Sequence, residues 1–581
     1  MNSKLNVEKT LPEHFFAQAA AQDAATAFLY CRPGEDTFVT MSWTRYRDEV
    51  AMLSQWFLDQ GIKKGDKVAL LSSNRPEWII TDLAIQSAGA VTIPIYPNSS
   101  ATDTQHILDH SEARWLIVDK IERLHSFDSS PLNGVLIFNA FPAGNDKFHA
   151  YAEATADASK TIQKPVKVKP EDLATIIYTS GTTGLPKGVM HTHGNLSQAM
   201  ISSHLVIETP EGMIDRFFSF LPLSHVAERV LVEMGSIREG AEVFFARSVD
   251  TIAEDLPIAQ PTILLCVPRL WEKMQEGIVA KVKKASPVSQ FVFKAAGFMG
   301  RTRTEGTRID SSQFAGIFPA LADKLVGKKL RARLGLSRTR MFVTGSAPTR
   351  PEIQKFFSSF GMPIREVYGL TENLSCGTLS FDDEILVDSC GKAFPHNELR
   401  IAEDGEIQFR SPWMFTGYYK NPAATREVLS EDGWFSTGDL GKIDELGRLF
   451  IVGRKKEMLK TSNGKYVAPV PIEDRIKSNP LFKDVMMVGD TRKFCIALVT
   501  VDKPNLDKTD YAAISAWFDV VNKPLASHEA VKKVGVLSEG FSIDNGSLTP
   551  TLKVKRSYVT KAKSDFIERV YSAPDFIVLE K

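Results

Sequence analysis

The distribution of apolar and polar positions over the first 120 residues predicts alternating helices and strands. From Tyr46 to Gln60 apolar residues recur at helical spacing, and Gly61 is suited to end that helix. Further along we expect strands at 67–71, 90–94 and 115–118, and helices at 75–88 and 103–112. Alternation of this kind is typical of α/β layers with largely parallel sheets.

A loop rich in glycine and hydroxyl groups follows the apolar run 174–177, which is typical of a buried strand. Glycines let backbone N–H groups approach a ligand where a Cβ would collide. The hydroxyl groups and a lysine add donors and a positive charge, which suits a polyphosphate. An ordinary glycine-rich hairpin turn is the alternative. The residues of this loop with binding character are Thr179, Ser180, Gly181, Thr182, Thr183, Gly184 and Lys187.

The spacing of this loop excludes a P-loop NTPase, whose motif G-x-x-x-x-G-K-[ST] places the lysine on the first turn of a helix. Here Lys187 is followed by glycine and then by residues 189–192, which predict another strand. We expect the next helix to begin at Asn195, a good N-cap residue. The loop therefore joins two strands. Its sequence TSGTTGLPKG resembles the phosphate-loop signature of the adenylate-forming superfamily, which includes acyl-CoA synthetases, peptide-synthetase adenylation domains and firefly luciferase.

Other segments resemble nucleotide-binding motifs of the same superfamily. TGSAP at 344–348 is similar to its adenine-binding element, YGLTE at 368–372 to its YGxTE signature, and TGD at 437–439 to its ribose-binding turn. The resemblance implies that Thr371 binds the α-phosphate and that Glu372 and Thr182 bind Mg²⁺. It places the following residues around the nucleotide: Gly345, Ser346, Ala347, Glu366, Tyr368, Gly369, Asp439, Arg454 and Lys456.

His225 ends the segment FLPLSH. A lone histidine at the end of an apolar strand is more often a core residue than a functional one, but the LPLxH element of the family lines the acyl pocket beside the phosphate loop. The resemblance therefore implies a binding role for His225. The neighbouring ERV and the segment VPRLWEKM at 267–274 look like the long-chain fatty acyl-CoA synthetase branch.

The C-terminal part carries two lysines to which the resemblance assigns chemistry. GRLFIVGRKKE at 447–457 matches the hinge between the large and small domains, although Gly453 stands where the family usually has an acidic residue. Lys460 belongs to the loop that enters the site for the second half-reaction. In LTPTLKVKR, Lys553 matches the lysine that acts in adenylation, and Lys555 is the competing assignment.

Composition narrows the class of protein without identifying it. The 581 residues contain 43% hydrophobic and 24% charged positions, as expected of a globular protein with more than one domain. Lys plus Arg and Asp plus Glu each number 70, so the whole chain shows no bias toward nucleic acid. Five scattered cysteines and an N-terminus without an apolar core predict a reduced, cytoplasmic protein without a signal peptide.

The segment 276–340 is an exception to this charge balance. It holds seven Lys and seven Arg against four acidic residues, a net charge of +10. Leucines recur there at near-helical spacing, which predicts a solvated basic helix packed on the domain. Two functional interpretations are a surface that contacts anionic membrane and one that attracts the phosphates of coenzyme A.

Together these features predict an α/β protein. We expect a large domain, 1–452, of two mainly parallel sheets with helices and a small β-barrel-like part, and a small mobile α+β domain, 453–581. The implied activity is ATP-dependent ligation of a long-chain fatty acid to coenzyme A through acyl-AMP, with Mg²⁺. The alternatives are transfer of the acyl group to a carrier protein, an aryl or luciferase-like enzyme, and an inactive binding module.

Overall fold

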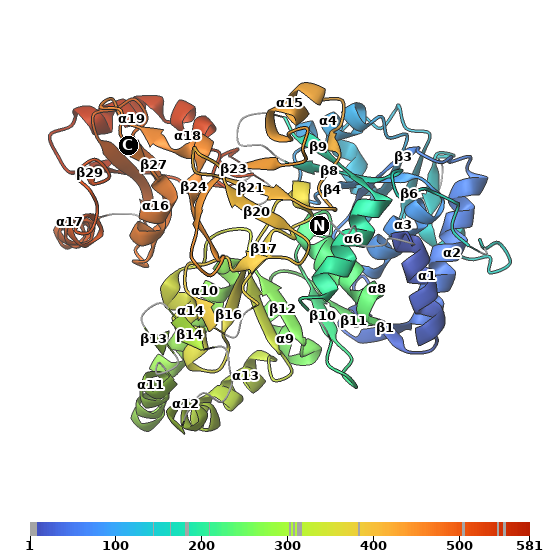
Figure 1. The fold of residues 1–581 in the computed structure, drawn as a ribbon, viewed down its shortest axis with the longest axis horizontal. Helices are drawn as coiled ribbons and strands as arrows, with labels where there is room; N and C mark the ends of the chain where they lie inside the picture. Colours follow the sequence, from blue (N-terminus) through green and yellow to red (C-terminus); the bar gives the residue numbers. More distant parts are fainter. Residues whose placement is uncertain are drawn as a thin grey trace.

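The computed structural model describes residues 9–142, 145–162, 164–179, 185–207, 209–300, 304–305, 308–310, 317–381, 384–501, 503, 506–542, 545–549 and 553–580. Two large mixed sheets, a four-stranded sheet and a separate C-terminal sheet organise these residues (Figure 1). The expected division into a large α/β part and a small C-terminal part is confirmed.

The first large sheet carries the phosphate-loop strands. Its core strands are parallel, and the antiparallel pair β8/β9 closes one side. In spatial order the strands are β22 (Gly417–Tyr418), β9 (Lys187–Thr192), β8 (Leu173–Thr179), β4 (Val91–Ile95), β3 (Lys67–Leu71), β5 (Trp115–Val118), β6 (Gly134–Ile137) and β7 (Phe148–Ala150). The strands expected at 67–71 and 115–118 are confirmed with the predicted bounds.

The second large sheet is parallel from β16 to β1 and antiparallel at both edges. In spatial order its strands are β19 (Lys392–Ala393), β17 (Thr378–Leu379), β16 (Ile364–Tyr368), β15 (Met341–Thr344), β12 (Ile263–Cys266), β10 (Arg216–Ser219), β11 (Glu242–Phe245), β1 (Thr26–Cys31) and β2 (Phe38–Ser42). Two of the segments that resemble nucleotide-binding motifs, 344–348 and 368–372, begin at the carboxyl ends of β15 and β16, where ligands of parallel sheets commonly bind.

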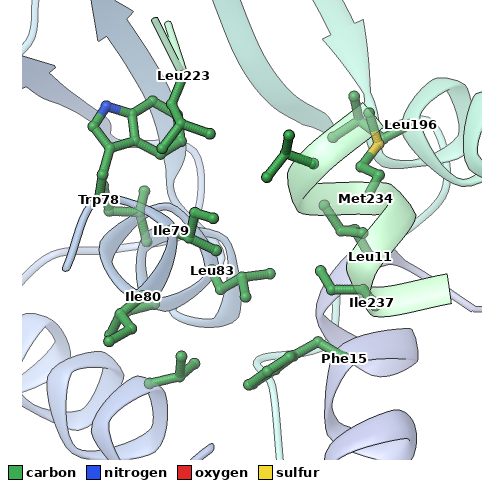
Figure 2. Packing of buried hydrophobic residues seen from close by; sticks show 14 of the residues in the cluster. Leu11, Phe15, Trp78, Ile79, Ile80, Leu83, Leu196, Leu223, Met234 and Ile237 are labelled. Carbon is green, nitrogen blue, oxygen red and sulfur yellow. The ribbon is translucent and has the colours of Figure 1, made fainter. Parts of the chain in front are cut away.

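Helices join the two sheets through one apolar core. Figure 2 shows Leu83 of one helix pointing toward the side where Phe15 and Ile237 of two others lie, and Trp78 of the first helix beside Leu223. The same buried cluster reaches strands of both sheets, so the sheets are held at a fixed separation. The helices involved are α1 (Leu11–Gln22), α2 (Trp43–Asp59), α3 (Pro76–Ser87), α6 (His193–His204) and α8 (Gly235–Glu239).

The start of α6 differs from the sequence-based prediction. The helix begins at His193 rather than after an Asn195 cap, because Thr192 is the N-cap. The Thr192 hydroxyl accepts the Asn195 N–H at 3.1 Å, and Asn195 Oδ1 accepts the Thr192 N–H at 3.0 Å. Asn195 is therefore the third residue of a capping box instead of the cap itself.

The remaining sheets flank the nucleotide motifs. An antiparallel sheet of β20 (Glu398–Ile401), β21 (Glu406–Arg410), β23 (Phe435–Ile443) and β24 (Leu449–Arg454) stands where the small barrel-like part was expected. The C-terminal domain has β27 (Phe482–Val488), β28 (Cys495–Val501), β29 (Val531–Val536) and β30 (Ile577–Leu579). Helices α16 (Pro469–Lys477), α17 (Lys508–Asn522), α18 (Arg556–Ala562) and α19 (Ser564–Ser572) cover this sheet. It has apolar clusters of its own, as a separate domain requires.

Candidate active site

The phosphate-loop candidate is anchored at both ends by the β8/β9 pair. Thr179, the last residue of β8, lies opposite Lys187, the first residue of β9. A Cβ on Gly188 would lie 2.7 Å from Ile176 Cγ2, so glycine permits the close approach of the two strands. The predicted ligands Ser180, Gly181, Thr182, Thr183 and Gly184 lie outside the described residues. The β8/β9 pair therefore brings together Thr179 and Lys187, which stand at the two ends of the loop.

A lysine, a tyrosine and a buried carboxyl group form a cluster beside this loop. Lys187 Nζ lies 5.1 Å from the centre of the Tyr418 ring, and the Tyr418 hydroxyl donates to Glu372 Oε1 at 2.7 Å. Burial raises the pKa of Glu372, while the Tyr418 hydrogen bond and the charges of Arg454 and Lys187 oppose that shift. Tyr418 is not among the site residues that the sequence motifs predict.

The turn that carries Thr371 and Glu372 is fixed by its backbone. His191 Nε2 lies 2.8 Å from the Thr371 carbonyl oxygen, and Asn373 Oδ1 accepts the Leu370 N–H at 2.8 Å. Burial lowers the pKa of His191 to about 4, so its imidazole is neutral at pH 7 and can donate to that carbonyl. The turn is therefore fixed to β9, the strand that carries Lys187.

Asp439 lies at the centre of the predicted nucleoside site. The Tyr368 hydroxyl donates to Asp439 Oδ2 at 2.6 Å, and Arg454 Nε donates to Oδ1 at 3.0 Å. Asp439 and Arg454 are direct partners across β23 and β24. Burial and the Asp439 charge raise the pKa of Tyr368, so it remains a neutral hydrogen-bond donor. The structure thus brings together three predicted residues from three strands.

The turns after β15 and β16 are compact. Ser346 has a φ of 70°, which is strained for a non-glycine residue. A Cβ on Gly345 would lie 2.6 Å from Val367 Cγ1, and one on Gly369 would lie 2.5 Å from the Ser375 backbone. Both glycines are therefore required by close packing. Ala347, the third predicted residue of the first turn, directly follows Ser346.

Glu366 is buried beneath these turns, with 5% of its surface exposed. Its carboxyl oxygens accept the Thr349 N–H at 3.2 Å and the Gln354 amide at 3.3 Å. Burial raises its pKa to about 8. The two accepted hydrogen bonds oppose this pKa shift, and they hold β16 against the turn after β15.

Lys553 extends from the C-terminal domain toward the cluster on the large domain. Its side chain as a whole is exposed, yet its ammonium group is surrounded by protein atoms. This burial and the nearby Arg454 lower the pKa of Lys553, whereas Asp439, Glu457 and Glu372 raise it. The lysine is therefore within electrostatic reach of two predicted ligands of ATP and Mg²⁺.

The other two predicted lysines lie elsewhere. Lys456 is exposed in the short turn Lys455–Glu457, beside Lys455, which pairs with Glu406 at 2.9 Å. Lys460 is exposed in the hairpin of β25 (Leu459–Lys460) and β26 (Tyr466–Val467), with Nζ 5.5 Å from the Tyr466 ring centre. The contacts described for Lys460 all lie within the C-terminal domain.

His225 directly precedes a helical segment that lines an apolar cavity. It caps the helix that begins at Val226, and its Nδ1 accepts the Ala227 N–H at 3.1 Å. Burial and the charge of Lys553 lower its pKa to about 4, so the ring is neutral at pH 7. The adjoining cavity is lined almost entirely by apolar surface. Val343 and Val367, two of its lining residues, directly precede the nucleotide turns in β15 and β16.

Comparison with known proteins places this arrangement in context. A family model described as AMP-binding enzyme matches residues 15–419, and one described as AMP-binding enzyme C-terminal domain matches 456–575. The chain is 32% identical over 576 residues to the long-chain-fatty-acid–CoA ligase FadD15 of Mycobacterium bovis, covering 94% of each chain. It is 30% identical over 595 residues to the long-chain-fatty-acid–CoA ligase ACSBG2 of Xenopus laevis, covering 92% of this chain and 80% of that one.

A solved structure shows the same fold. The adenylation domain of a carboxylic acid reductase from Segniliparus rugosus, in complex with AMP and a co-purified carboxylic acid, superposes with a TM-score of 0.75. The match has 20% identity and covers 98% of this chain and 95% of that chain.

Proposed function

The chain belongs to the AMP-binding enzyme family, and from this premise we propose that it is an ATP-dependent long-chain fatty acid–CoA ligase. The observation that carries the proposal is the convergence of Lys553, Glu372 and Asp439 beside an apolar cavity. A carrier-protein ligase would share these groups, but the curated relatives are named as CoA ligases. An inactive module would not need a lysine from another domain at this position.

The reaction has two steps. A carboxylate oxygen of the fatty acid attacks the α-phosphorus of ATP, which forms acyl-AMP and releases pyrophosphate. The thiolate of coenzyme A then attacks the acyl carbon and releases AMP. In the first step Lys553 stabilises charge on the carboxylate and the α-phosphate, while Lys187 binds the departing pyrophosphate end. One donor of this kind contributes about 2.7–4 kcal/mol to the transition state.

The described residues suit Mg²⁺ held jointly with ATP. Glu372 is buried, Tyr418 donates to its Oε1, and we propose that Oε2 binds the cation. Among the described residues no group of three or more His, Cys, Asp or Glu side chains forms a metal cluster. One carboxylate plus phosphate oxygens and water is the arrangement that Mg²⁺ commonly takes. When bound, the ion would neutralise phosphate charge, and Thr182 is the second proposed ligand.

For the second step we propose that the C-terminal domain, 453–581, rotates at the hinge around Lys456. Rotation removes Lys553 and brings in the hairpin of Lys460. Gly453 supports this assignment, because its missing side chain leaves the backbone free to change conformation. Lys455 crosses the hinge to Asp404 at 2.5 Å and Glu406 at 2.9 Å, and rotation must break both ion pairs.

We further propose that the basic segment 276–340 contacts anionic membrane at the inner face of the cell. None of the described helices has the length and apolar character needed to cross a bilayer. However, α11 (Pro287–Gly300) and α12 (Ile317–Ala322) expose a set of large apolar side chains, and the two helices lie side by side (Figure 1). This set is Val288, Phe291, Phe298, Ile317 and Phe318, which are 60–84% exposed.

Exposed basic side chains precede and follow these apolar residues in the sequence. Exposed lysines of the segment are Lys281, Lys283, Lys284, Lys294, Lys324, Lys328 and Lys329. Each contributes about 1 kcal/mol of attraction near an anionic surface. Exposed aromatic residues within a basic rim are the pattern of a face that enters the lipid interface. A fatty acid dissolved in the same bilayer would then be close to the enzyme.

Vesicle flotation tests the membrane proposal. Vesicles containing phosphatidylserine should bind the protein at low salt, and Phe291→Ser with Phe298→Ser should release it. Val520→Ser on α17, a 58% exposed apolar position of the other domain, is the matched control. Failure of phosphatidylserine vesicles to bind the wild type at low salt would refute this contact without affecting the ligase assignment.

The ligase proposal is tested by ATP–pyrophosphate exchange over a series of carboxylic acids, followed by a thioester assay with coenzyme A. Exchange that depends on a fatty acid, with acyl-CoA formed only when coenzyme A is present, is the expected result. Exchange without acyl-CoA formation would favour the carrier-protein alternative. A lack of exchange with any acid would favour an inactive module.

A further inference from the structure

One helical segment lines the apolar cavity over its length. Residues 226–239 are continuous through α7 (Val226–Glu228), a π-helical stretch (Arg229–Met234) and α8. The residues of this segment that line the cavity are Ala227, Val230, Leu231, Gly235, Arg238 and Glu239. The cavity therefore begins two residues from His225, at the nucleotide side, and ends at the C-terminus of α8.

The end of the cavity at α8 is polar, unlike the rest of its wall. His204, the last residue of α6, bonds through Nδ1 to the Glu239 carboxylate. The Thr209 hydroxyl lies 2.8 Å from Glu239 Oε2 and 2.6 Å from Asp215 Oδ2. Arg340 in turn donates to Asp215 at 2.6 Å. The carboxylate of Glu239 is thus held from two sides, and its side chain is 9% exposed.

The length of this helical segment indicates how long an alkyl chain the cavity can hold. Ala227 and Glu239 are twelve residues apart, which sets an upper limit of about 18 Å at the α-helical rise of 1.5 Å per residue, because the π-helical stretch between them rises less per residue. With carbon–carbon bonds of about 1.5 Å and tetrahedral angles, an extended alkyl chain advances about 1.25 Å per carbon. The distance therefore accommodates about 14 carbons.

We propose that the His204–Glu239 pair is the chain-length stop of the acyl site. The proposal rests on the proposed function, since it takes the cavity to hold the alkyl chain of the fatty acid. A chain of about 14 carbons fills the apolar part and places its methyl group at the pair. Each additional carbon must either separate the pair, leaving Glu239 poorly solvated, or bend within the cavity.

Chain-length profiles of kcat/KM test the stop, with saturated acids from 8 to 22 carbons. The wild type should prefer acids of about 14–16 carbons and decline beyond them. In His204→Ala the end of the cavity loses its imidazole, so the ratio of kcat/KM for the 20-carbon acid to that for the 14-carbon acid should rise about tenfold or more. His125→Ala, at an exposed histidine outside the cavity, is the matched control and should keep the wild-type profile.

A second variant tests the path of the chain independently. Leu231 lines the cavity four residues from Ala227, about 6 Å along the helix. Leu231→Trp should therefore shift the preferred acid to 10 carbons or fewer. This variant gives a readout even if His204→Ala does not fold, and thermal unfolding identifies that case.

The outcomes distinguish failure of the chain-length stop from failure of the ligase assignment. Profiles shifted to longer acids in His204→Ala and to shorter acids in Leu231→Trp would support the stop. Unchanged profiles in both folded variants, with fatty-acid-dependent exchange intact, would overturn the stop and leave the ligase assignment standing. Wild-type protein that shows no exchange with any acid would refute the ligase assignment itself.

Discussion

Arg454 and Asp439 face each other directly across β23 and β24, with Arg454 Nε 3.0 Å from Asp439 Oδ1. The other oxygen of Asp439 accepts the Tyr368 hydroxyl at 2.6 Å. Both carboxylate oxygens are therefore engaged before a nucleotide is present. A ribose must share or replace one of these partners, and Arg454 is the last residue of the large-domain sheet before the hinge. Nucleotide binding and hinge position are thus connected through one ion pair.

We expect Asp439→Asn to weaken ATP binding by about tenfold to a hundredfold, since a hydrogen bond to a charged group is worth about 1.5–3 kcal/mol. The amide keeps the shape of the side chain but loses the charge that holds Arg454. The KM for ATP in the exchange assay measures the effect. Glu445→Gln, on the exposed turn after β23, should leave the KM for ATP unchanged. An equal increase of this KM in Glu445→Gln would contradict the role of Asp439 in binding ATP.

The buried Glu366 predicts a pH dependence of stability. Its pKa is about 8 in the folded protein against an ordinary 4.5 in the unfolded chain. Between these values the folded state retains a proton that the unfolded state releases, so the contribution of Glu366 to stability falls as pH rises. Glu366→Gln removes this titration and keeps a neutral side chain. The loss of thermal stability of the wild type between pH 5 and pH 8 should therefore be smaller in the variant.

Melting temperatures of the wild type and Glu366→Gln at pH 5 and pH 8 test this prediction. Glu352→Gln, an exposed carboxylate on α14 (Pro351–Ser359), serves as the control and should retain the wild-type pH dependence. Identical pH dependence in the wild type and Glu366→Gln would mean that Glu366 is ionised in the folded protein.

For Lys460 we expect separation of the two half-reactions. The contacts described for Lys460 lie within the C-terminal domain, so Lys460→Ala should not impair formation of acyl-AMP. Transfer of the acyl group from acyl-AMP to coenzyme A should fall about tenfold or more. Single-turnover measurements of each step test this, and a comparable loss of ATP–pyrophosphate exchange would place Lys460 in the first step instead.

Local sequence patterns were sufficient to predict strands whose bounds depend on neighbouring residues alone. The strands 67–71 and 115–118 have the predicted bounds because each is a short apolar run between turns. The start of α6 was misplaced because Thr192 and Asn195 are both good caps, and only their reciprocal hydrogen bonds decide between them. Motif resemblance supplied Tyr368, Asp439 and Arg454, which the structure brings into contact.

Contacts between distant segments could not be predicted in this way. Tyr418 reaches Glu372 over 46 positions, and its Gly-Tyr context gives no sign of that hydrogen bond. The pair His204–Glu239 depends on how α6 and α8 pack between the sheets. Neither pair has a characteristic spacing in the sequence, because each follows from the tertiary arrangement of its helices and strands.

The central claim is that Lys553 acts in adenylation and is not needed for transfer to coenzyme A. Lys555, two residues further on, is the N-cap of α18 and serves as the matched control. Its backbone N–H donates to the Ser547 carbonyl, and Lys555→Ala keeps this hydrogen bond. The decisive measurement compares Lys553→Ala and Lys555→Ala in both half-reactions, with synthetic acyl-AMP as the substrate of the second. We predict that Lys553→Ala lowers ATP–pyrophosphate exchange about 100- to 1,000-fold and spares thioester formation, while Lys555→Ala spares both. Equal loss of both half-reactions in Lys553→Ala, or loss of exchange in Lys555→Ala alone, would contradict the account.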